Sequence, residues 1–322
     1  MIIDWYPGHM KKARTQIIEV MPTIDLVIEV LDARLPVSSS NPLLAKLRGQ
    51  KPCIKVLNKK DLADPTVTKA WVACFEREHR VRAIPLEAKD RRDVGLLPKL
   101  CRKMIPHKGN RGQRSLRVMI VGIPNVGKST LINTLAGRKM ALVGDKPAVT
   151  TCPQQIDLRN GILLSDTPGL LWPIMDNPDG ALRLAASGAI GDNAYDSAAT
   201  AAAILQELIG RYPALIMQRY QLNDLTGDTT DILGEIGRKR GCLVTGGDVD
   251  LYRAAELLLR ELRAGKLGRI SLERPNSETT ASSQDDHAGQ PAPQPSSREN
   301  PHRDDSVSQL SPEQKESSTD ET

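Results

Sequence analysis

Aromatic side chains are scarce in this 322-residue sequence, in which Phe, Tyr and Trp together make up 3%. Proteins that read single-stranded nucleic acid usually stack the bases on exposed aromatic rings. A chain with so few rings is poorly suited to that mode of recognition.

Cysteine is also scarce, and its five residues are scattered over positions 53, 74, 101, 152 and 242. An odd number of cysteines without a CxxC pair fits neither a disulfide framework nor a structural zinc site. We expect all five thiols to be reduced, as in a cytoplasmic protein.

Long hydrophobic runs are absent, because no stretch approaches 18 consecutive apolar residues. The first ten residues, MIIDWYPGHM, also lack a basic segment followed by an apolar run. These two patterns mark membrane spans and secretory signals. The sequence therefore predicts a cytoplasmic protein that is neither secreted nor integral to a membrane.

The charge is unevenly distributed along the chain. Lys and Arg number 44 against 39 Asp and Glu, but ten acidic and only three basic residues lie in 275–322. Residues 1–274 therefore carry 41 basic and 29 acidic residues, a net charge of +12. Such an excess attracts polyanions, either nucleic acid or anionic lipid, although a merely soluble surface is the alternative.

Three regions differ in composition, and the length alone points to about two domains. Residues 275–322 are rich in Pro, Ser, Thr and Gln, and cannot bury enough apolar surface to offset the entropy of ordering. We expect a disordered acidic tail there. Over 24–190, short apolar runs alternate with amphipathic stretches, which predicts an α/β fold with a parallel sheet. Over 178–268, Ala and Leu recur at helical spacing.

The predicted strands indicate where a ligand would bind. Three apolar runs read as buried strands, at 26–31, 53–57 and 116–121, and two shorter runs are further candidates, at 82–86 and 161–164. Ligands of open α/β sheets bind at the carboxyl ends of the strands. The residues that follow these runs are therefore the first candidates for a site.

A complete GxxxxGK[ST] motif, GIPNVGKS, occupies residues 122–129 between a predicted strand and a helical stretch. Such a loop surrounds phosphates with its own backbone N–H groups and those of the following helix. We expect Lys128 to reach the β- and γ-phosphates and Ser129 to coordinate Mg²⁺.

Two later segments complete a site for a nucleoside triphosphate. Asp166 and Gly169 belong to DTPG, which follows the apolar run ILL. We expect Asp166 to bind Mg²⁺ through water and the Gly169 amide to meet the γ-phosphate, so that this loop senses hydrolysis. Between the two motifs, PAVTT at 147–151 offers a threonine hydroxyl to the metal, and Thr150 is favoured over Thr151.

We expect NKKD at 58–61, which follows the predicted strand 53–57, to read the base of the nucleotide. The carboxylate of Asp61 can accept hydrogen bonds from guanine N1–H and the exocyclic amine, and adenine offers no such pair of donors. A buried carboxylate left unpaired rejects the wrong base strongly. In EAK at 87–89, the Ala88 N–H is expected near guanine O6.

The order of these elements is unusual, because NKKD and EAK precede the phosphate loop, whereas most GTPases present the phosphate loop first. The sequence resembles the circularly permuted GTPases, in particular those of the ribosome biogenesis GTPase A type. The resemblance covers residues 1–274. It is carried by the permuted motifs and by four further segments, which are WYPGHMKKA, DARLPVSSSNP, DTPGLLWP and KRGCLVTGGDVD.

The resemblance implies a GTPase domain over 1–176 and a helical domain over 177–274 that contacts ribosomal RNA. The disordered acidic tail over 275–322 lies outside the resemblance and is predicted from composition. It implies an assembly factor that binds precursors of the large (50S) subunit in the GTP state, hydrolyses GTP slowly alone and is released after particle-stimulated hydrolysis. The implied partners are GTP or GDP, 23S rRNA and ribosomal proteins. A monomer is expected in solution. The alternative is an RNA-binding placeholder protein in which GTP stabilises one conformation and turnover is incidental.

The predicted binding residues are the following. GTP is assigned to Asn58, Lys59, Lys60, Asp61, Glu87, Ala88, Asn125, Val126, Gly127, Lys128, Ser129, Thr130 and Gly169. Mg²⁺ is assigned to Ser129, Thr150 and Asp166.

Catalysis needs a special explanation, because Leu170 stands where many GTPases carry the Gln that orients water. An imidazole can hydrogen-bond water near neutral pH, so His9 is one candidate, the alternative being a loop or RNA contact. Asn125 is the second: in relatives such an Asn helps to hold K⁺, which stabilises developing negative charge. Its alternative role is to suit the tight loop. With Lys128, these are the predicted catalytic residues.

Overall fold

The computed structural model describes residues 8–108, 114–140, 154–167 and 177–275, all within one compact unit. Side chains are described from Arg14 onward. None of the described helices has the length and hydrophobicity that crossing a bilayer requires. The four cysteines in these ranges are free thiols, and Cys152 lies outside them.

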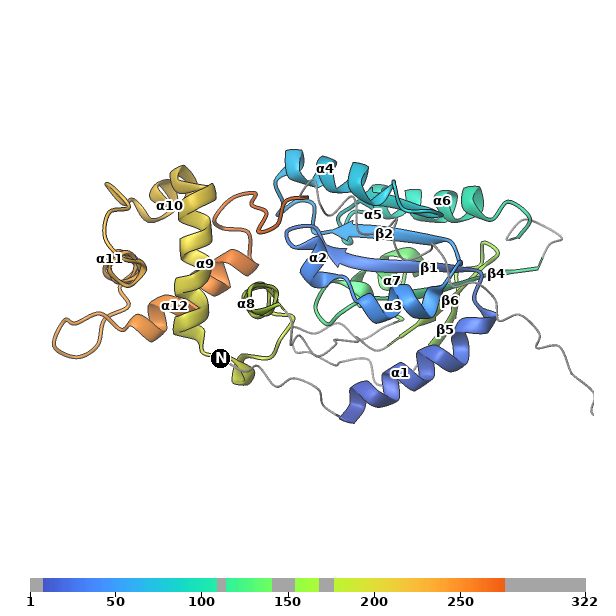
Figure 1. Cartoon of the computed structure of the whole chain (residues 1–322), viewed down its shortest axis with the longest axis horizontal. Coiled ribbons are helices and arrows are strands. Elements are labelled where there is room, and N and C mark those ends of the chain that lie inside the picture. Colours follow the sequence, from blue (N-terminus) through green and yellow to red (C-terminus); the bar gives the residue numbers. More distant parts are fainter. Residues whose placement is uncertain (1–7, 109–113, 141–153, 168–176, 276–322) are drawn as a thin grey trace, which may run out of the picture. The chain divides into compact units, whose positions relative to one another are not determined.

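Six strands among the described residues form a single sheet in the order β3-β2-β1-β4-β6-β5 (Figure 1). The strands are β1 (Leu26–Asp32), β2 (Cys53–Asn58), β3 (Val81–Pro85), β4 (Leu116–Val121), β5 (Gln154–Asp157) and β6 (Ile162–Asp166). The chain places β2 and β3 on one side of β1 and then returns to place β4 and β6 on the other. The switch point between β1 and β4 is where an α/β sheet opens a crevice for ligands.

The short apolar runs were sufficient to predict the five parallel strands, with shifts of one or two residues at their ends. The sequence did not predict β5, which pairs antiparallel with β6 at the edge of the otherwise parallel sheet. This edge strand has the sequence QQID, in which Ile156 is buried and Gln155 and Asp157 are exposed. A short polar strand at a sheet edge leaves no apolar run to detect.

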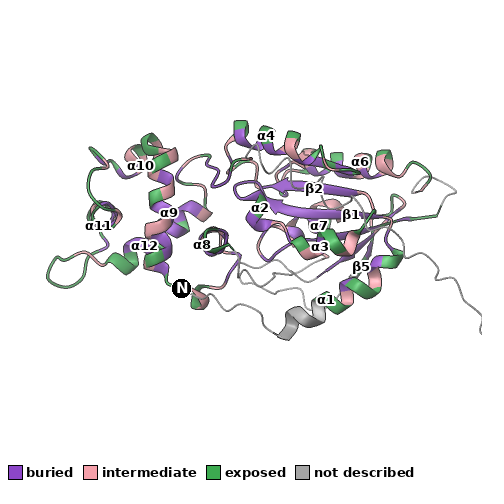
Figure 2. Ribbon diagram, in the orientation of Figure 1, coloured by how far each residue is buried: buried purple, intermediate pink, exposed green. Residues whose placement is uncertain are grey.

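Both faces of the central strands are covered, so β1 and β2 are buried along their whole length (Figure 2). On one face, Leu31 and Leu57 pack with Trp71 and Phe75 of α4 (Pro65–Phe75). The other face contributes to a larger core that includes Val30. Strands buried on both faces read as continuous apolar runs. The remaining helices of this part are α1 (Gly8–Val20), η1 (Met21–Thr23), α2 (Pro36–Ser39), α3 (Pro42–Arg48), α5 (Arg91–Val94), α6 (Leu96–Met104) and α7 (Lys128–Ala136).

Residues 177–275 are helical and contribute no strand to the sheet, as the Ala and Leu spacing predicts. One isolated bridge joins Leu243 and Val249. The elements are α8 (Pro178–Ser187), η2 (Asp192–Ala194), α9 (Ser197–Arg211), α10 (Pro213–Tyr220), α11 (Thr229–Arg240) and α12 (Leu251–Arg263). The division into domains at residues 176 and 274 stays a prediction.

The apolar stripe of α12 is buried except at its start, where Leu251 is 38% exposed. Arg263, the last residue of α12, has a structural role. Its guanidinium donates hydrogen bonds of 3.0 Å to the carbonyls of Ala185 and Ala186. These carbonyls lie in the last turn of α8, and that of Ala185 also accepts the N–H of Gly188, the residue that caps the helix, at 3.1 Å. Arg263 therefore joins two helices.

The segment after α12 returns to the α/β part of the chain. The Ile270 N–H donates to the Leu62 carbonyl at 2.9 Å, and the Leu272 N–H donates to the Arg34 carbonyl at 2.7 Å. Trp71 of α4 donates its indole N–H to the Glu273 carbonyl at 3.2 Å. This return segment therefore shares backbone hydrogen bonds with loops that follow β1 and β2.

A buried ion cluster lies beneath the return segment. Asp32, at the end of β1, accepts hydrogen bonds from Arg34 at 2.8 and 3.0 Å and from Lys59 at 2.9 Å. Arg34 is 2% exposed and also donates to the Leu262 carbonyl at 3.0 Å. Burial alone would raise the pKa of Asp32, but the two cations outweigh it and hold that pKa far below its usual range.

Replacing Arg34 should strongly destabilise the protein. Arg34→Ala leaves the buried Asp32 with Lys59 as its remaining cation and removes the donor to Leu262. Breaking a buried ion pair costs about 3 to 5 kcal/mol, and urea unfolding measures the loss. Arg77 is exposed, so Arg77→Ala is the matched control and should change the free energy of unfolding by less than about 0.5 kcal/mol. Similar losses in the two variants would contradict the assigned role of the cluster.

Candidate nucleotide-binding site

The predicted motifs meet at the carboxyl edge of the sheet. The phosphate loop follows β4, and EAK follows β3. Asn58 is the last residue of β2, and Asp166 is the last residue of β6. Because β2, β3, β4 and β6 run parallel within one sheet, these loops lie along the same edge.

Two glycines allow the phosphate loop its tight path. A Cβ on Gly127 would lie 2.3 Å from the Asn58 side-chain nitrogen, and Gly127 has φ of 98°. A Cβ on Gly122 would lie 2.5 Å from the Val30 carbonyl oxygen. Larger residues at these positions would push the loop away from β1 and β2. The motif therefore needs glycine here for close backbone packing as well as for phosphate access.

Lys128 is a buried cation at the start of α7. Its side chain is 7% exposed, and its ammonium group donates to the Ile123 carbonyl of the phosphate loop at 2.7 Å. Burial lowers the pKa of Lys128 to about 8, and the nearby Asp166 only partly opposes this shift. A buried ammonium of this kind gains most from an anionic ligand.

Asp166 shows the opposite shift. It is 1% exposed, and neither carboxylate oxygen has a hydrogen-bond partner among the described residues. Burial raises its pKa to about 6, although Lys128 opposes the change. An unpartnered buried carboxylate is a suitable hard oxygen donor for Mg²⁺, and the half-buried Ser129 adds a hydroxyl. The described residues thus fit a magnesium site in which the protein supplies two oxygen donors, and water and phosphate oxygens would supply the others.

Asn58 joins two loops that are far apart in sequence. Its amide nitrogen donates to the Val126 carbonyl at 2.6 Å, and its amide oxygen accepts from the Ala88 N–H at 2.9 Å. Thr134 of α7 donates its hydroxyl to the Ala88 carbonyl at 2.7 Å. The sequence analysis assigned the Ala88 N–H to guanine O6. Because this N–H already donates to Asn58, it can contact the base only as a donor shared between the two acceptors.

Within NKKD, the two lysines are used by the protein itself. Lys59 has φ of 61° and pairs with Asp32, whereas Lys60 pairs with Asp93 at 2.6 Å. Asp61 is exposed, so the expectation of a buried carboxylate at this position was wrong for the chain without nucleotide. It is not itself part of a salt bridge among the described residues. Its carboxylate is the group of the motif that remains available for a base.

Sequence reasoning missed Asp93 as part of this site. Its carboxylate accepts from Lys60 and, at 2.9 Å, from the Glu87 N–H. Burial would raise the pKa of Asp93, but these hydrogen bonds outweigh it and lower the pKa. Asp93 lies 32 residues after Asp61 with no motif around it, so the sequence offered no signal for this role. Asp32 and Arg34 did carry one, because both lie in DARLPVSSSNP.

Asn125 adopts φ of 58°, which agrees with the tight-loop alternative for this residue. Its amide nitrogen also donates to the Gly188 carbonyl at 2.7 Å. Gly188 caps the carboxyl end of α8, and Arg263 packs against it. The phosphate loop is therefore hydrogen-bonded to the helical part of the chain, a contact that the sequence did not predict.

Several predicted residues lie outside the described parts. Thr150, Thr151, Gly169 and Leu170 fall in the gaps at 141–153 and 168–176. His9 belongs to α1, but its side chain is outside the description. Their assigned roles stay predictions. Among the remaining candidates, Val126 is buried, and Ser129 and Thr130 begin α7 beside Lys128.

Comparisons with known proteins agree with this arrangement. A family described as 50S ribosome-binding GTPase matches residues 117–208. Ribosome biogenesis GTPase A of Bacillus cereus is 42% identical over 281 residues, which cover 85% of this chain and 95% of that protein. The chain belongs to the ribosome biogenesis GTPase A family. The family member from Thermotoga maritima is 34% identical over 273 residues, with 85% and 95% covered.

Solved structures support the same fold. The GDP-bound structure of TM YlqF has a TM-score of 0.58 and 31% sequence identity, covering 81% of this chain and 99% of that one. The GNP-bound YlqF from T. maritima has a TM-score of 0.57 at 31% identity, covering 82% and 98%. The predicted family and the circularly permuted P-loop GTPase fold are confirmed, and the chain is a GTPase.

The buried charge of Asp166 should cost stability when nucleotide and metal are absent. The pKa of Asp166 is higher in the folded than in the unfolded protein, so the protonated carboxyl group adds stability below pH 4. That stability is lost as the pH rises through about 6 and the buried carboxylate becomes charged. Asp166→Asn removes the charge. We expect the variant to be more stable than the parent by about 1 to 3 kcal/mol above pH 6, with GTP turnover lost.

Urea unfolding from pH 4 to 8 in the presence of a chelator tests this expectation. The difference between variant and parent should grow between pH 4 and 6 and then remain constant. A difference that does not change with pH would contradict the assigned cause.

Removing the Asn58 side chain should weaken nucleotide binding. Asn58→Ala leaves the Val126 carbonyl and the Ala88 N–H without their partners, at about 1 to 3 kcal/mol for each buried group. We expect GDP affinity, measured with a fluorescent analogue, to fall at least tenfold. Asn160→Ala is the control, since Asn160 lies in the exposed turn before β6. Unchanged affinity in the Asn58 variant would show that the bridge does not shape the site.

Proposed function

We propose that this chain is a GTP-hydrolysing assembly factor for the large (50S) ribosomal subunit. It binds the precursor particle in the GTP state and leaves after hydrolysis that the particle stimulates. The observation that carries the proposal is the gathering of a guanine-type NKKD, a phosphate loop and a buried Asp166 at one sheet edge, in a chain whose relatives are named ribosome biogenesis GTPase A.

The proposed nucleotide site uses side chains from both halves of the permuted order. The exposed carboxylate of Asp61 reads guanine, and the buried ammonium of Lys128 pairs with the phosphates. Ser129 and Asp166 hold Mg²⁺, together with Thr150. The ion supplies charge compensation at the phosphates when it is bound.

The proposed partners are 23S rRNA and ribosomal proteins, and the net charge of +12 on residues 1–274 supports an anionic partner. In this proposal, residues 1–176 hydrolyse GTP, and residues 177–274 contact rRNA. The tail that the sequence predicts at 275–322 lies outside the described residues from 276 onward. The protein acts as a monomer in the cytoplasm.

Two groups are proposed to assist hydrolysis on the particle. Asn125 helps to hold K⁺ near the phosphates, and its hydrogen bond to Gly188 fixes the amide beside the loop. His9 orients the attacking water. Leu170 cannot orient the water, because an aliphatic side chain forms no hydrogen bond with it. In this proposal His9 supplies that hydrogen bond, and the K⁺ held by Asn125 stabilises the developing negative charge.

GTP turnover with purified ribosomal subunits tests the proposal. Alone, the protein should turn over at about 10⁻⁴ s⁻¹, as unstimulated small GTPases do. Large subunits in potassium buffer should raise this rate, small subunits should not, and sodium should weaken the effect. Asp166→Asn provides the inactive control.

The outcomes separate two classes of function. Stimulation by large subunits alone supports an assembly GTPase with hydrolysis as a timer. Binding to large subunits and to their precursors without stimulation by either would contradict the proposal, and would favour the placeholder protein in which turnover is incidental.

A further inference from the structure

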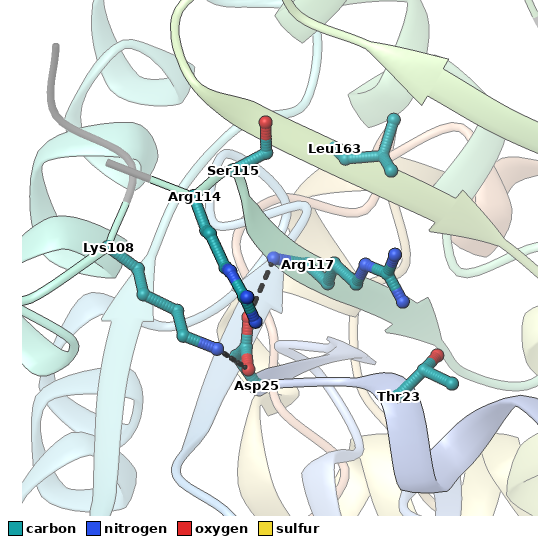
Figure 3. Close-up of a pocket in the computed structure, with 7 residues that line it drawn as sticks. All are labelled: Thr23, Asp25, Lys108, Arg114, Ser115, Arg117 and Leu163. Carbon is teal, nitrogen blue, oxygen red and sulfur yellow. Dashed lines mark hydrogen bonds and ion pairs between the residues drawn. The ribbon is translucent and has the colours of Figure 1, made fainter. Parts of the chain in front are cut away.

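A second recess lies at the opposite edge of the sheet from the nucleotide loops. It is a cleft of about 480 Å³ where β1, β4 and β6 begin (Figure 3). Asp25 and Arg117 line it, at the entrance to β1 and in the first part of β4. The phosphate loop follows the opposite end of β4. Because β4 has six residues, and a strand rises about 3.3 Å per residue, the two sites are separated by roughly 20 Å. The cleft is therefore not part of the nucleotide site.

Positive side chains dominate the cleft. Lys108, Arg114 and Arg117 line it with a single acidic residue, Asp25 (Figure 3). Lys108 pairs with one Asp25 oxygen at 2.7 Å, and the other oxygen accepts the Arg117 backbone N–H at 3.0 Å. The charge of Asp25 is thus balanced within the protein.

The two guanidinium groups remain available. Arg114 and Arg117 are exposed, and neither side chain forms a salt bridge in the described parts of the chain. Thr23 and Ser115 add hydroxyl groups to the lining. Two free guanidinium groups beside hydroxyls are suited to phosphate oxygens, which arginine can bind in a bidentate manner.

The surrounding sequence strengthens this charge. Asp93 and Asp145 are consecutive acidic residues, and no Asp or Glu lies between them. Residues 94–117 carry seven basic residues, which are Lys99, Arg102, Lys103, Lys108, Arg111, Arg114 and Arg117. Three of these seven basic residues, Lys108, Arg114 and Arg117, line the cleft, and the sequence around them adds no acidic residue.

We propose that this cleft binds the phosphodiester backbone of double-stranded RNA. The lining contains no aromatic ring on which a base could stack, so the contact is with backbone phosphates. The inference rests on the proposed function in taking ribosomal RNA as the natural duplex. It goes beyond that function by giving the GTPase domain an RNA contact of its own, at the edge remote from GTP.

Salt dependence of RNA binding tests the proposal. The affinity of the full chain for a short RNA duplex is measured by fluorescence anisotropy at several KCl concentrations. In Arg114→Ala/Arg117→Ala, the slope of log affinity against log salt should become shallower by about 2, because each phosphate contact contributes about 1. GDP affinity should be unchanged, which also shows that the variant is folded.

A matched control removes the same charge elsewhere. Arg77 and Arg82 are exposed residues of the same domain, on the α4–β3 side, and Arg77→Ala/Arg82→Ala should leave the slope unchanged. Equal changes in the two double variants would reflect the general field of the protein and overturn the proposal. An unchanged slope in the cleft variant would also overturn the proposal. If that variant instead lost binding to anionic phospholipid vesicles, the cleft would be a lipid site and not an RNA site.

A gain of affinity provides a test that misfolding cannot mimic. Asp25→Asn removes the acidic charge and frees Lys108, while the amide oxygen can still accept the Arg117 N–H. We expect tighter RNA binding and a steeper salt slope, and weaker binding would contradict the assignment. The two proposals fail separately: large subunits can stimulate GTP turnover whether or not the cleft variant changes the slope, and duplex RNA can bind in the cleft even if the subunits do not stimulate.

Discussion

One amide side chain, that of Asn58, holds the nucleotide loops in register. In a permuted chain the base-reading loops come first and the phosphate loop later, so the peptide chain itself does not keep them together. Asn58 supplies the missing connection by donating to Val126 and accepting from Ala88. Its bonds span 68 and 30 residues of sequence, and the nearby Gly127 leaves just enough space for them. These hydrogen bonds connect both base-reading segments to the phosphate loop across the permuted order.

The same loops are linked to the helical part of the chain from two sides. Lys59 of NKKD meets Asp32 and Arg34, and Arg34 reaches Leu262 at the end of α12. Asn125 of the phosphate loop reaches Gly188 at the end of α8. A ligand that shifts either loop also changes these contacts. The free energy of nucleotide binding is therefore coupled to the positions of α8 and α12.

The sequence was sufficient to predict the parallel strands, the motifs and their common edge, because each depends on local patterns of apolar residues and glycine. It could not predict contacts that depend on tertiary geometry. Asp93, Gly188 and Arg263 carry no motif, and their roles arise where distant segments meet. The polar strand β5 escaped detection for a related reason: an exposed edge strand needs little hydrophobicity.

The opposite pKa shifts of Lys128 and Asp166 indicate what the site was selected for. Burial disfavours the charged form of both side chains, so it lowers the pKa of Lys128 and raises that of Asp166. The attraction between the two charges offsets these shifts only in part. A protein optimised for stability would replace such groups, since burying charge without full pairing is costly. They are explained by a ligand that brings both signs of charge, namely phosphate oxygens for the ammonium and a metal ion for the carboxylate. The stability cost expected without ligand and the affinity expected for a metal-bound nucleotide thus have one physical origin.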